Sequence, residues 1–257
     1  MNAMMIISTG ITIVILGFLY WRMVKREIPR PVGWLQALLP IAIGLLSMPM
    51  TIPISMSYLN ALAADPNAVK LNDLSFFQAL ERSFIVAGGL EEIAKLILIL
   101  VVLLIFRKKV KNVYEYILIG ACIGIGFTVF EEFYYGGSES ATAFSAAERL
   151  ISVSAHMTFN MVMGEFLGRA KFSKLNGKSS AVLYYAPALL IPIVVHSLYD
   201  VCTTFNSNLM RGEMSGMIRA AVGYAALLVF ELVVLIRCKK KTEVFCGMRT
   251  LAEETAT

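Results

Sequence analysis

Apolar runs of about twenty residues recur along the chain, and they restrict its fold more than any other feature. A bilayer core of about 30 Å is crossed by roughly 20 helical residues, because each residue adds about 1.5 Å. Seven stretches reach or approach that length: 4–21, 34–56, 84–106, 113–135, 149–168, 182–201 and 217–236. Hydrophobic residues make up 58% of the 257 residues and charged residues 16%, which excludes an ordinary soluble domain. The sequence predicts an all-α, polytopic transmembrane helix bundle of about seven spans.

Basic residues gather after every second apolar run. The groups lie at 22–30, 107–111, 169–178 and 237–241. The positive-inside rule then predicts that the N-terminus is outside the cell and the C-terminus is cytoplasmic. Because the positive charge is divided among these short groups, the net charge of +5 does not indicate nucleic-acid binding.

The same pattern divides the chain into three parts. Residues 1–82 hold the N-terminal spans and a short amphipathic helix, predicted at 71–83, that we expect to lie at the outer surface. The second apolar run contains Pro40, Pro49 and Pro53, which predict a kinked or broken helix. Residues 83–201 form a predicted catalytic four-helix membrane core, and residues 202–257 form the last span and a cytoplasmic tail.

Polar side chains interrupt four of these apolar runs. An ionisable group inside a membrane costs free energy, so each one is a candidate functional residue. The four clusters are Glu91, Glu92 and Lys95; Glu131, Glu132 and Tyr135; His156 and Asn160; and His196 and Asp200. Each cluster falls roughly 6–10 Å from the outer end of its predicted helix. Because neighbouring helices run in opposite directions, this coincidence predicts one shared site in the outer half of the membrane.

Helical spacing supplies each candidate group with partners. Residues four apart share a helix face, and adjacent residues such as Glu91 and Glu92 differ by about 100°. One of these two carboxylates could therefore activate water while the other supports it, and the spacing leaves open which. The predicted supporting residues are Lys95, Tyr135, Arg149, Asn160 and Asp200.

Three acidic residues nearer the opposite membrane face have a simpler interpretation. Glu115, Glu165 and Glu231 lie apart from the four clusters. A lone carboxylate near the end of a span usually extends toward water, and we expect that of all three.

Carboxylates and imidazoles in this combination suit hydrolysis. In one mechanism no metal is needed, and Glu91 or Glu92 deprotonates a water molecule. In the other, His156, His196 and Glu131 bind Zn²⁺, again with Glu91 or Glu92 as the base. The sequence contains neither an HExxH helix nor a GxSxG motif.

Four motifs resemble those of the PrsW-type intramembrane proteases. EEIAK (91–95) resembles the EExxK motif of that family, and HSLYD (196–200) resembles its HxxxD motif. GIGFTVFEEFYY (124–135) is similar to GxGFxxxENxxY, with Glu132 where asparagine is usual. The stretch from Arg149 through His156 to GRAK (168–171) resembles a fourth motif, and all four follow the family's order.

The resemblance implies a multi-pass protease of the bacterial cytoplasmic membrane, distantly similar to the CAAX prenyl endopeptidases. It implies five functional residues: Glu91, Glu92, Glu131, His156 and His196. It also implies that the partner is a membrane-anchored protein such as an anti-sigma factor, cleaved near the extracytoplasmic face. The alternative is an ion- or proton-coupled transporter that uses the same carboxylates and histidines. The off-centre charges and the lack of an internal repeat favour the protease.

Overall fold

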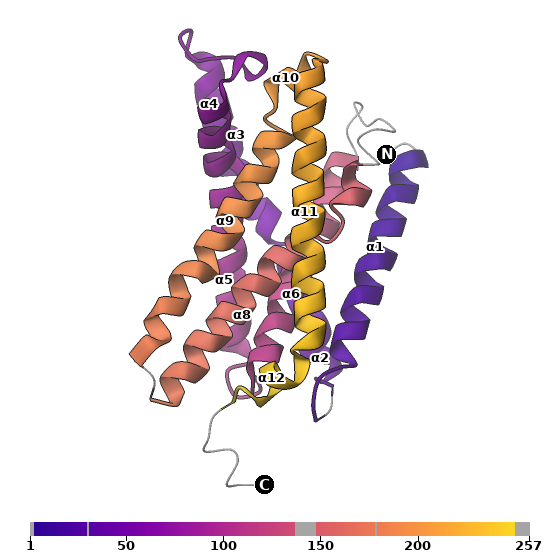
Figure 1. Cartoon of the computed structure of the whole chain (residues 1–257), viewed down its shortest axis with the longest axis vertical. Coiled ribbons are helices and arrows are strands. Elements are labelled where there is room, and N and C mark those ends of the chain that lie inside the picture. The colour runs from indigo at the N-terminus through magenta and orange to yellow at the C-terminus, as the bar shows by residue number, and fades with distance from the viewer. Residues whose placement is uncertain (1–2, 30, 137–147, 178, 250–257) are drawn as a thin grey trace.

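The computed structural model describes residues 3–29, 31–136, 148–177 and 179–249. Every regular element in those ranges is helical (Figure 1), which confirms the predicted all-α class. The α-helices are α1 (Ala3–Val24), α2 (Trp34–Gly44), α3 (Ser47–Ala64), α4 (Phe76–Ser83), α5 (Gly89–Ile105), α6 (Val113–Gly136), α8 (Ala155–Leu175), α9 (Tyr185–Cys202), α10 (Ser207–Met210), α11 (Met214–Lys240) and α12 (Thr242–Gly247). Short 3-10 segments η1 (Leu71–Asp73) and η3 (Ser179–Tyr184) and the π-helical turn η2 (Phe84–Gly88) complete the chain order.

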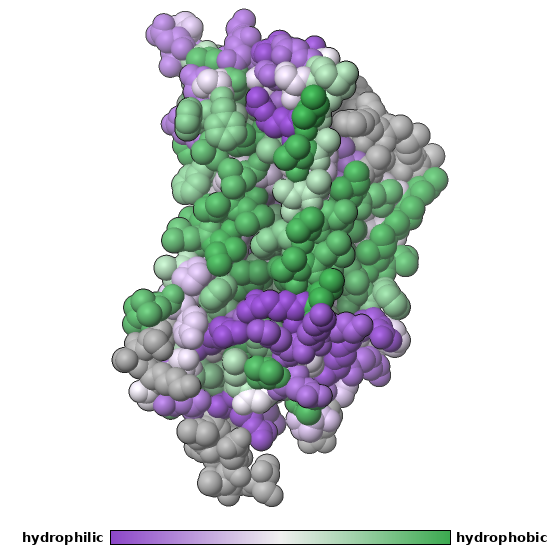
Figure 2. Space-filling model, viewed as in Figure 1, coloured by the Kyte–Doolittle hydropathy of each residue, from purple (hydrophilic) through white to green (hydrophobic). Residues whose placement is uncertain are grey.

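Five helical segments within the described residues are long and apolar enough to cross a membrane. They are Ile6–Val24, Trp34–Ala64, Val113–Tyr134, Val182–Met210 and Met214–Lys240. Figure 2 shows the corresponding hydrophobic band, bounded by hydrophilic residues at both ends of the molecule. The other two predicted spans correspond to α5, which has 17 residues, and α8. Helix α8 is buried along most of its length, so its own side chains need not be apolar. The count of seven spans and the orientation stay predictions.

Helix α6 lies in the middle of the bundle and packs against α1, α2, α5 and α8. Its small residues permit a close approach to α8. A Cβ atom at Gly120 would collide with the main chain of Asn160, and one at Gly124 would collide with the main chain of His156. Close contact between these two helices therefore determines where His156 lies relative to α6.

The second apolar run is divided, as its prolines predict. Helix α2 ends at Gly44 and α3 begins at Ser47. Pro49 falls in the first turn of α3, where the missing backbone N–H is tolerated. Gly44 lies against the main chain of Ile123 in α6, so the break occurs where the chain approaches the central helix closely.

The amphipathic segment before the third run forms a helix, but not a separate one. Ser75 and Gln78 cap the start of α4 reciprocally in a capping box. Helix α4 then continues through the π-helical turn η2 directly into α5. The backbone N–H of Gly89 bonds to the carbonyl of Phe84, five residues earlier, and this bond carries the chain through the turn without a break.

The three lone acidic residues do not extend toward water, contrary to our expectation. Glu115, Glu165 and Glu231 are all buried. Glu165 accepts two bonds from the guanidinium of Arg237, both 2.5 Å long, and Glu231 accepts a bond of 2.9 Å from Ser154 Oγ. Helix packing supplies these partners from distant parts of the sequence, which spacing along one helix could not reveal.

Candidate functional site

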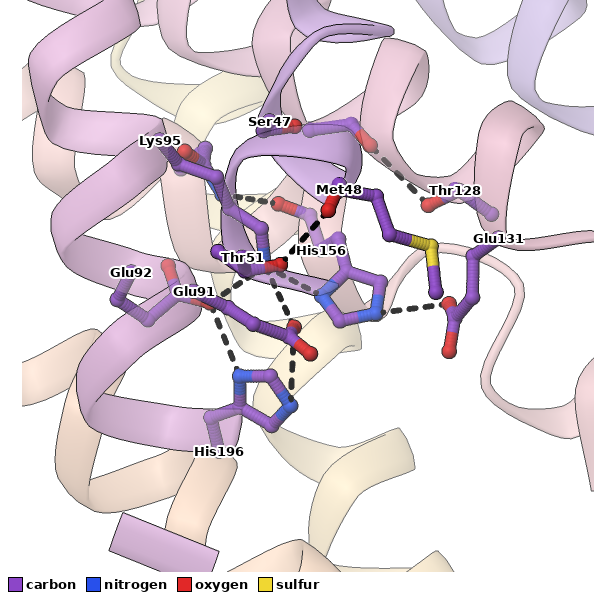
Figure 3. A network of polar contacts seen from close by, with 12 residues as sticks. Ser47, Met48, Thr51, Glu91, Glu92, Lys95, Thr128, Glu131, His156 and His196 are labelled. Atoms are coloured by element: carbon purple, nitrogen blue, oxygen red, sulfur yellow. Dashed lines mark hydrogen bonds and ion pairs between the residues drawn. The ribbon is translucent and has the colours of Figure 1, made fainter. Parts of the chain in front are cut away.

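Four helices bring the predicted polar clusters together (Figure 3). Glu91 and Glu92 lie in the first turn of α5, and His156 lies in the first turn of α8. Glu131 is near the end of α6, and His196 is near the end of α9. Helices that run in opposite directions therefore present these residues at one level of the bundle. The predicted meeting of the clusters is confirmed by the contacts below, whereas the catalytic role of each residue stays a prediction.

Lys95 and Glu92 form a fully buried ion pair at the base of the site. The distance from Lys95 Nζ to Glu92 Oε1 is 2.8 Å, and both side chains have 0% exposure. Lys95 Nζ also lies 3.4 Å from Glu91 Oε2 and 3.6 Å from the centre of the Phe127 ring. An ammonium group this deeply buried needs such partners, since an unpaired charge there would be costly.

His156 lies between Lys95 and Glu131. Its Nδ1 is 3.1 Å from Lys95 Nζ, and its Nε2 is 3.1 Å from Glu131 Oε2. Because the ammonium group can only donate, Nδ1 is the acceptor and Nε2 carries the proton donated to Glu131. Both ring nitrogens are therefore engaged, and the orientation of the ring is determined.

His196 has the complementary arrangement. Its Nδ1 is 3.0 Å from Glu92 Oε1, so Glu92 accepts the proton on that nitrogen. Its Nε2 then lies 3.6 Å from Asp200 Oδ2 and 4.0 Å from Glu91 Oε2. Phe159 stacks on the ring of His196 with centroids 5.4 Å apart. Each histidine thus has one nitrogen bonded to a carboxylate. The other nitrogen contacts Lys95 in His156, and lies near Asp200 and Glu91 in His196.

Glu91, His156 and His196 could hold a metal ion. One ligand atom from each lies within 4.8 Å of the others. This set differs from the predicted one, because Glu91 takes the place that the sequence analysis assigned to Glu131. Glu131 bonds to Nε2 of His156, which leaves Nδ1 for a metal ion. In histidine metal sites the nitrogen that does not bind the metal usually donates to such a carboxylate.

Glu91 and Glu92 occupy different environments despite being adjacent. The side chain of Glu91 is 17% exposed and lines a cavity, whereas that of Glu92 is completely enclosed. Glu92 Oε2 is buried and has no hydrogen-bond partner in the described part of the chain. Burial therefore distinguishes two carboxylates that helical spacing could not.

The supporting residues are placed in several ways. Asp200 contacts His196 as predicted, and Asn160 donates to the main-chain carbonyl of His156 at 2.9 Å rather than to its ring. Arg149 forms a 3.1 Å ion pair with Glu132. The side chain of Tyr135 lies outside the residues that the structure describes.

The pairing of Glu132 also involves the N-terminal helix. Thr9 of α1 donates to Glu132 Oε2 at 3.4 Å, and Glu132 is buried. Glu132 stands where the resembling motif has asparagine, and Arg149 supplies the positive charge that a buried carboxylate requires. This contact joins α1 to the end of α6 beside the site.

Two aromatic residues of the site were missed in the sequence. Phe127 packs on His156 with ring centroids 4.4 Å apart, and Phe159 stacks on His196. Phe127 lies four residues before Glu131 and Phe159 three residues after His156, so each shares a helix face with a predicted site residue. That spacing was the available signal, but apolar residues are too common in these runs for it to be specific.

Two cavities reach the site from different sides. The first, of about 290 Å³, has a polar wall that includes Arg149, Tyr199 and Tyr224. The second, of about 280 Å³, has an apolar wall that includes Ile52, Met56 and Val86 of α3 and η2. Their shared lining residues are Glu131, His196, Asp200 and Thr204. The polar cluster therefore separates a polar cavity from an apolar one.

The fold and the site define a helical membrane protein with a buried centre of carboxylates and imidazoles. Residues 31–236 match the sequence model of the PrsW family of intramembrane metalloproteases. The chain belongs to this family, and the predicted resemblance is confirmed.

Three curated relatives, each called Protease PrsW, support this assignment. The protein of Clostridioides difficile (strain 630) is 34% identical over 121 residues, which are 46% of this chain and 50% of the relative. That of Halalkalibacterium halodurans is 32% identical over 131 residues, covering 49% and 55%, respectively. That of Bacillus subtilis (strain 168) is 32% identical over 127 residues, covering 49% and 56%. The chain thus spans about half the length of the curated relatives that it matches. No solved structure matches the chain significantly.

Proposed function

We propose that this chain is an intramembrane endopeptidase that hydrolyses a peptide bond of a single-pass membrane protein. The observation that carries the proposal is the convergence of Glu91, His156 and His196 at the junction of two cavities. Membership of the PrsW family supports the same reaction class. So many buried ionisable groups in one place favour a functional role over packing alone, since each of them costs free energy.

The donor set fits a catalytic metal. Two imidazoles and one carboxylate form the His₂Glu pattern of zinc hydrolases. Beside them, Glu92 Oε2 is a buried acceptor without a hydrogen-bond partner among the described residues. We propose that Glu91, His156 and His196 hold the ion. When bound, it would polarise the scissile carbonyl and acidify a water molecule. Because Lys95 now bonds to His156 Nδ1, uptake of the ion requires this contact to be exchanged.

The remaining carboxylates have supporting roles in this proposal. Glu92 orients His196 through Nδ1, and Glu131 orients His156 through Nε2. Glu131 also lines both cavities, so it can accept a proton from the attacking water. Asp200 lies beside His196 and lines the same cavities.

A metal-free mechanism has one observation in its favour. The ammonium group of Lys95 already contacts Glu91 and His156, so the site contains its own positive charge. In that mechanism Glu91 deprotonates the water, because it is the more exposed carboxylate of the pair. Metal analysis separates the two mechanisms, as described below.

The cavities suggest how a substrate would lie. Where a substrate chain passes from its transmembrane helix into water, its residues are apolar on the membrane side of the cleaved bond and polar on the other side. The wall formed by Ile52 and Val86 suits the apolar side, and the wall that includes Arg149 and Tyr224 suits the polar side. We propose an anti-sigma factor type of substrate, cut near the extracytoplasmic face. The position of the site, away from the basic groups at the α12 end, supports this side of the membrane.

Reconstitution with a tagged single-pass protein tests the proposal. Wild-type protein should cleave the substrate, and Glu91→Gln, His156→Ala and His196→Ala should each reduce the rate at least ~100-fold. Glu81→Gln is the matched control, because Glu81 is an exposed carboxylate on α4. Undiminished cleavage by all three variants would contradict the proposed site. Ion flux across the vesicles without cleavage would support the transporter instead.

Metal content is measured on the same preparations. We expect about one equivalent of bound metal in wild type, loss of activity with a chelator and recovery with Zn²⁺. Elemental analysis should show reduced metal in His156→Ala and His196→Ala. Full activity of protein that contains no metal would favour the mechanism in which Glu91 acts alone.

A further inference from the structure

A third cavity, separate from the two that reach the candidate site, lies between α1 and α11. Helix α1 packs on α6, and a cavity of about 350 Å³ remains between α1 and α11. Phe18 and Leu19 form its wall on α1, and Leu235 and Ile236 form its wall on α11. Met161 of α8 contributes the buried inner side. The cavity is therefore an apolar cleft within the membrane-spanning part of the bundle.

Three basic residues line the same cavity. They are Arg22 and Arg26, which follow Phe18 at intervals of four, and Lys239, which follows Leu235 by four. Arg22 shares a face of α1 with Phe18, Lys239 shares a face of α11 with Leu235, and Arg26 lies in the turn after α1. Each apolar wall therefore continues into positive charge. In Figure 2 the hydrophobic band meets a hydrophilic belt at this end of the molecule, where α11 joins α12.

The charges of these three residues are not neutralised by the protein. Among the residues that the structure describes, no carboxylate forms an ion pair with Arg22, Arg26 or Lys239. Their neighbour Arg237 is different, because Glu165 binds its guanidinium with two bonds. The bundle thus supplies a counter-ion for the arginine that joins α11 to α8, and leaves the cavity-lining charges available.

We infer that this cleft binds an anionic phospholipid. Its acyl chain would lie against Phe18, Leu235 and Ile236, and its phosphate would lie among the three basic side chains. Basic pockets between transmembrane helices are suited to such headgroups. A free phosphate would use only the charged end, whereas a phospholipid also fills the apolar part. This inference does not depend on the proposed peptidase activity.

Tryptophan fluorescence provides a local probe. The chain has two tryptophans, and the exposed Trp34 can be replaced by phenylalanine so that only Trp21 reports. The centre of the Trp21 ring lies 6.1 Å from the centre of the Phe18 ring, and Phe18 lines the cleft. Full-length Trp34→Phe protein in nanodiscs would be titrated with phosphatidylglycerol or phosphatidylcholine carrying brominated acyl chains. We expect half-maximal quenching at a mole fraction of phosphatidylglycerol at least about fivefold lower than that of phosphatidylcholine.

Two triple variants with equal loss of charge test the residues. The first variant replaces three cleft residues by glutamine: Arg22→Gln, Arg26→Gln and Lys239→Gln. It should lose the preference for phosphatidylglycerol. The control is Lys25→Gln with Lys240→Gln and Lys241→Gln, whose exposed residues do not line the cleft, and it should retain the preference. Equal quenching by both lipids, or equal loss in both triple variants, would overturn the inference. Competition by millimolar inorganic phosphate would show a site for phosphate alone and would also overturn it.

Discussion

At the scale of single residues, the site depends on how differently neighbouring carboxylates are buried. Glu91 and Glu92 are adjacent, but Glu92 is enclosed with Lys95 and His196 while Glu91 faces a cavity. Removing one partner from a buried ion pair usually costs about 3–5 kcal/mol, because the other charge is left uncompensated. Glu91 is partly exposed and lies farther from Lys95, at 3.4 Å, so its removal should cost less.

This difference predicts that two similar variants differ in thermal stability. Glu91→Gln should reduce the cleavage rate at least ~100-fold with little change in melting temperature. Glu92→Gln should lower the melting temperature by several degrees as well as the rate, because Lys95 and His196 lose their acceptor. Thermal denaturation in detergent, together with the cleavage assay, measures both. Equal melting temperatures of the two variants would contradict the assignment of roles.

A second residue-scale feature lies in the connection between α1 and α2. Burial, together with the hydrogen bond and negative charge of the neighbouring Glu115 carboxyl, raises the pKa of Glu27 to about 8. The backbone N–H of Val32 and the charge of Lys111 oppose this shift only in part. The folded protein therefore retains a proton on Glu27 at pH values where an unfolded chain has released it.

The sign of the resulting pH dependence follows from linkage. The stabilising contribution of Glu27 is complete below about pH 4.5 and is lost as the pH rises through about 8. We expect the melting temperature to fall by several degrees between pH 5 and pH 9, and to fall less in Glu27→Gln. Glu243→Gln, at an exposed acidic residue of α12, is the control and should behave as wild type. An unchanged pH dependence in Glu27→Gln would exclude this carboxyl as the cause.

At the scale of helices, the contact between α6 and α8 positions the histidine. A Cβ atom at Gly124 would meet the main chain of His156 and Met157, which a flexible side chain cannot relieve. Helix α8 is polar for a membrane span, yet it is accommodated because other helices cover it. Its role is therefore set by its position in the bundle and not by its hydropathy.

Gly124→Ala should separate α6 from α8. We expect a loss of about 1–3 kcal/mol in stability from overpacking, and loss of cleavage because His156 moves. The control is Gly17→Ala on α1, where an added Cβ meets nothing within 4 Å. In that variant the higher helix propensity of alanine should leave stability unchanged or increase it by ~1 kcal/mol. Wild-type activity of Gly124→Ala would show that the close approach is not needed for the site.

At the scale of the whole molecule, orientation determines which side of the membrane the site serves. The four polar clusters lie toward the α10 end, and the basic groups lie toward the α12 end. The positive-inside rule predicts that the basic end lies in the cytoplasm. The site would then open near the extracytoplasmic surface.

Cysteine labelling tests this orientation. A background without Cys122, Cys202, Cys238 and Cys246 would carry Met210→Cys after α9 or Lys240→Cys at the end of α11, both at exposed positions. A membrane-impermeant maleimide should label the first variant in intact cells and the second only after permeabilisation. The reverse pattern would place the site at the cytoplasmic surface.

Hydropathy and helical spacing account for much of this structure. The apolar runs predict the helices because the bilayer requires internally bonded backbone, and the division between α2 and α3 follows from its prolines. The meeting of Glu91, Glu131, His156 and His196 could be predicted because their depths coincide. Packing partners from distant helices could not be predicted, as the buried positions of Glu165 and Glu231 show.

The amino-acid sequence by itself determines which segments are helical and at what depth their polar groups lie, since both depend on local periodicity and length. The choice between Glu91 and Glu92, the pairing of Arg149 with Glu132, and the replacement of Glu131 by Glu91 in the candidate metal set appear only in the packed bundle. These features depend on which side chains meet across helix interfaces and on how completely each is enclosed. Neither quantity is a property of one helix alone.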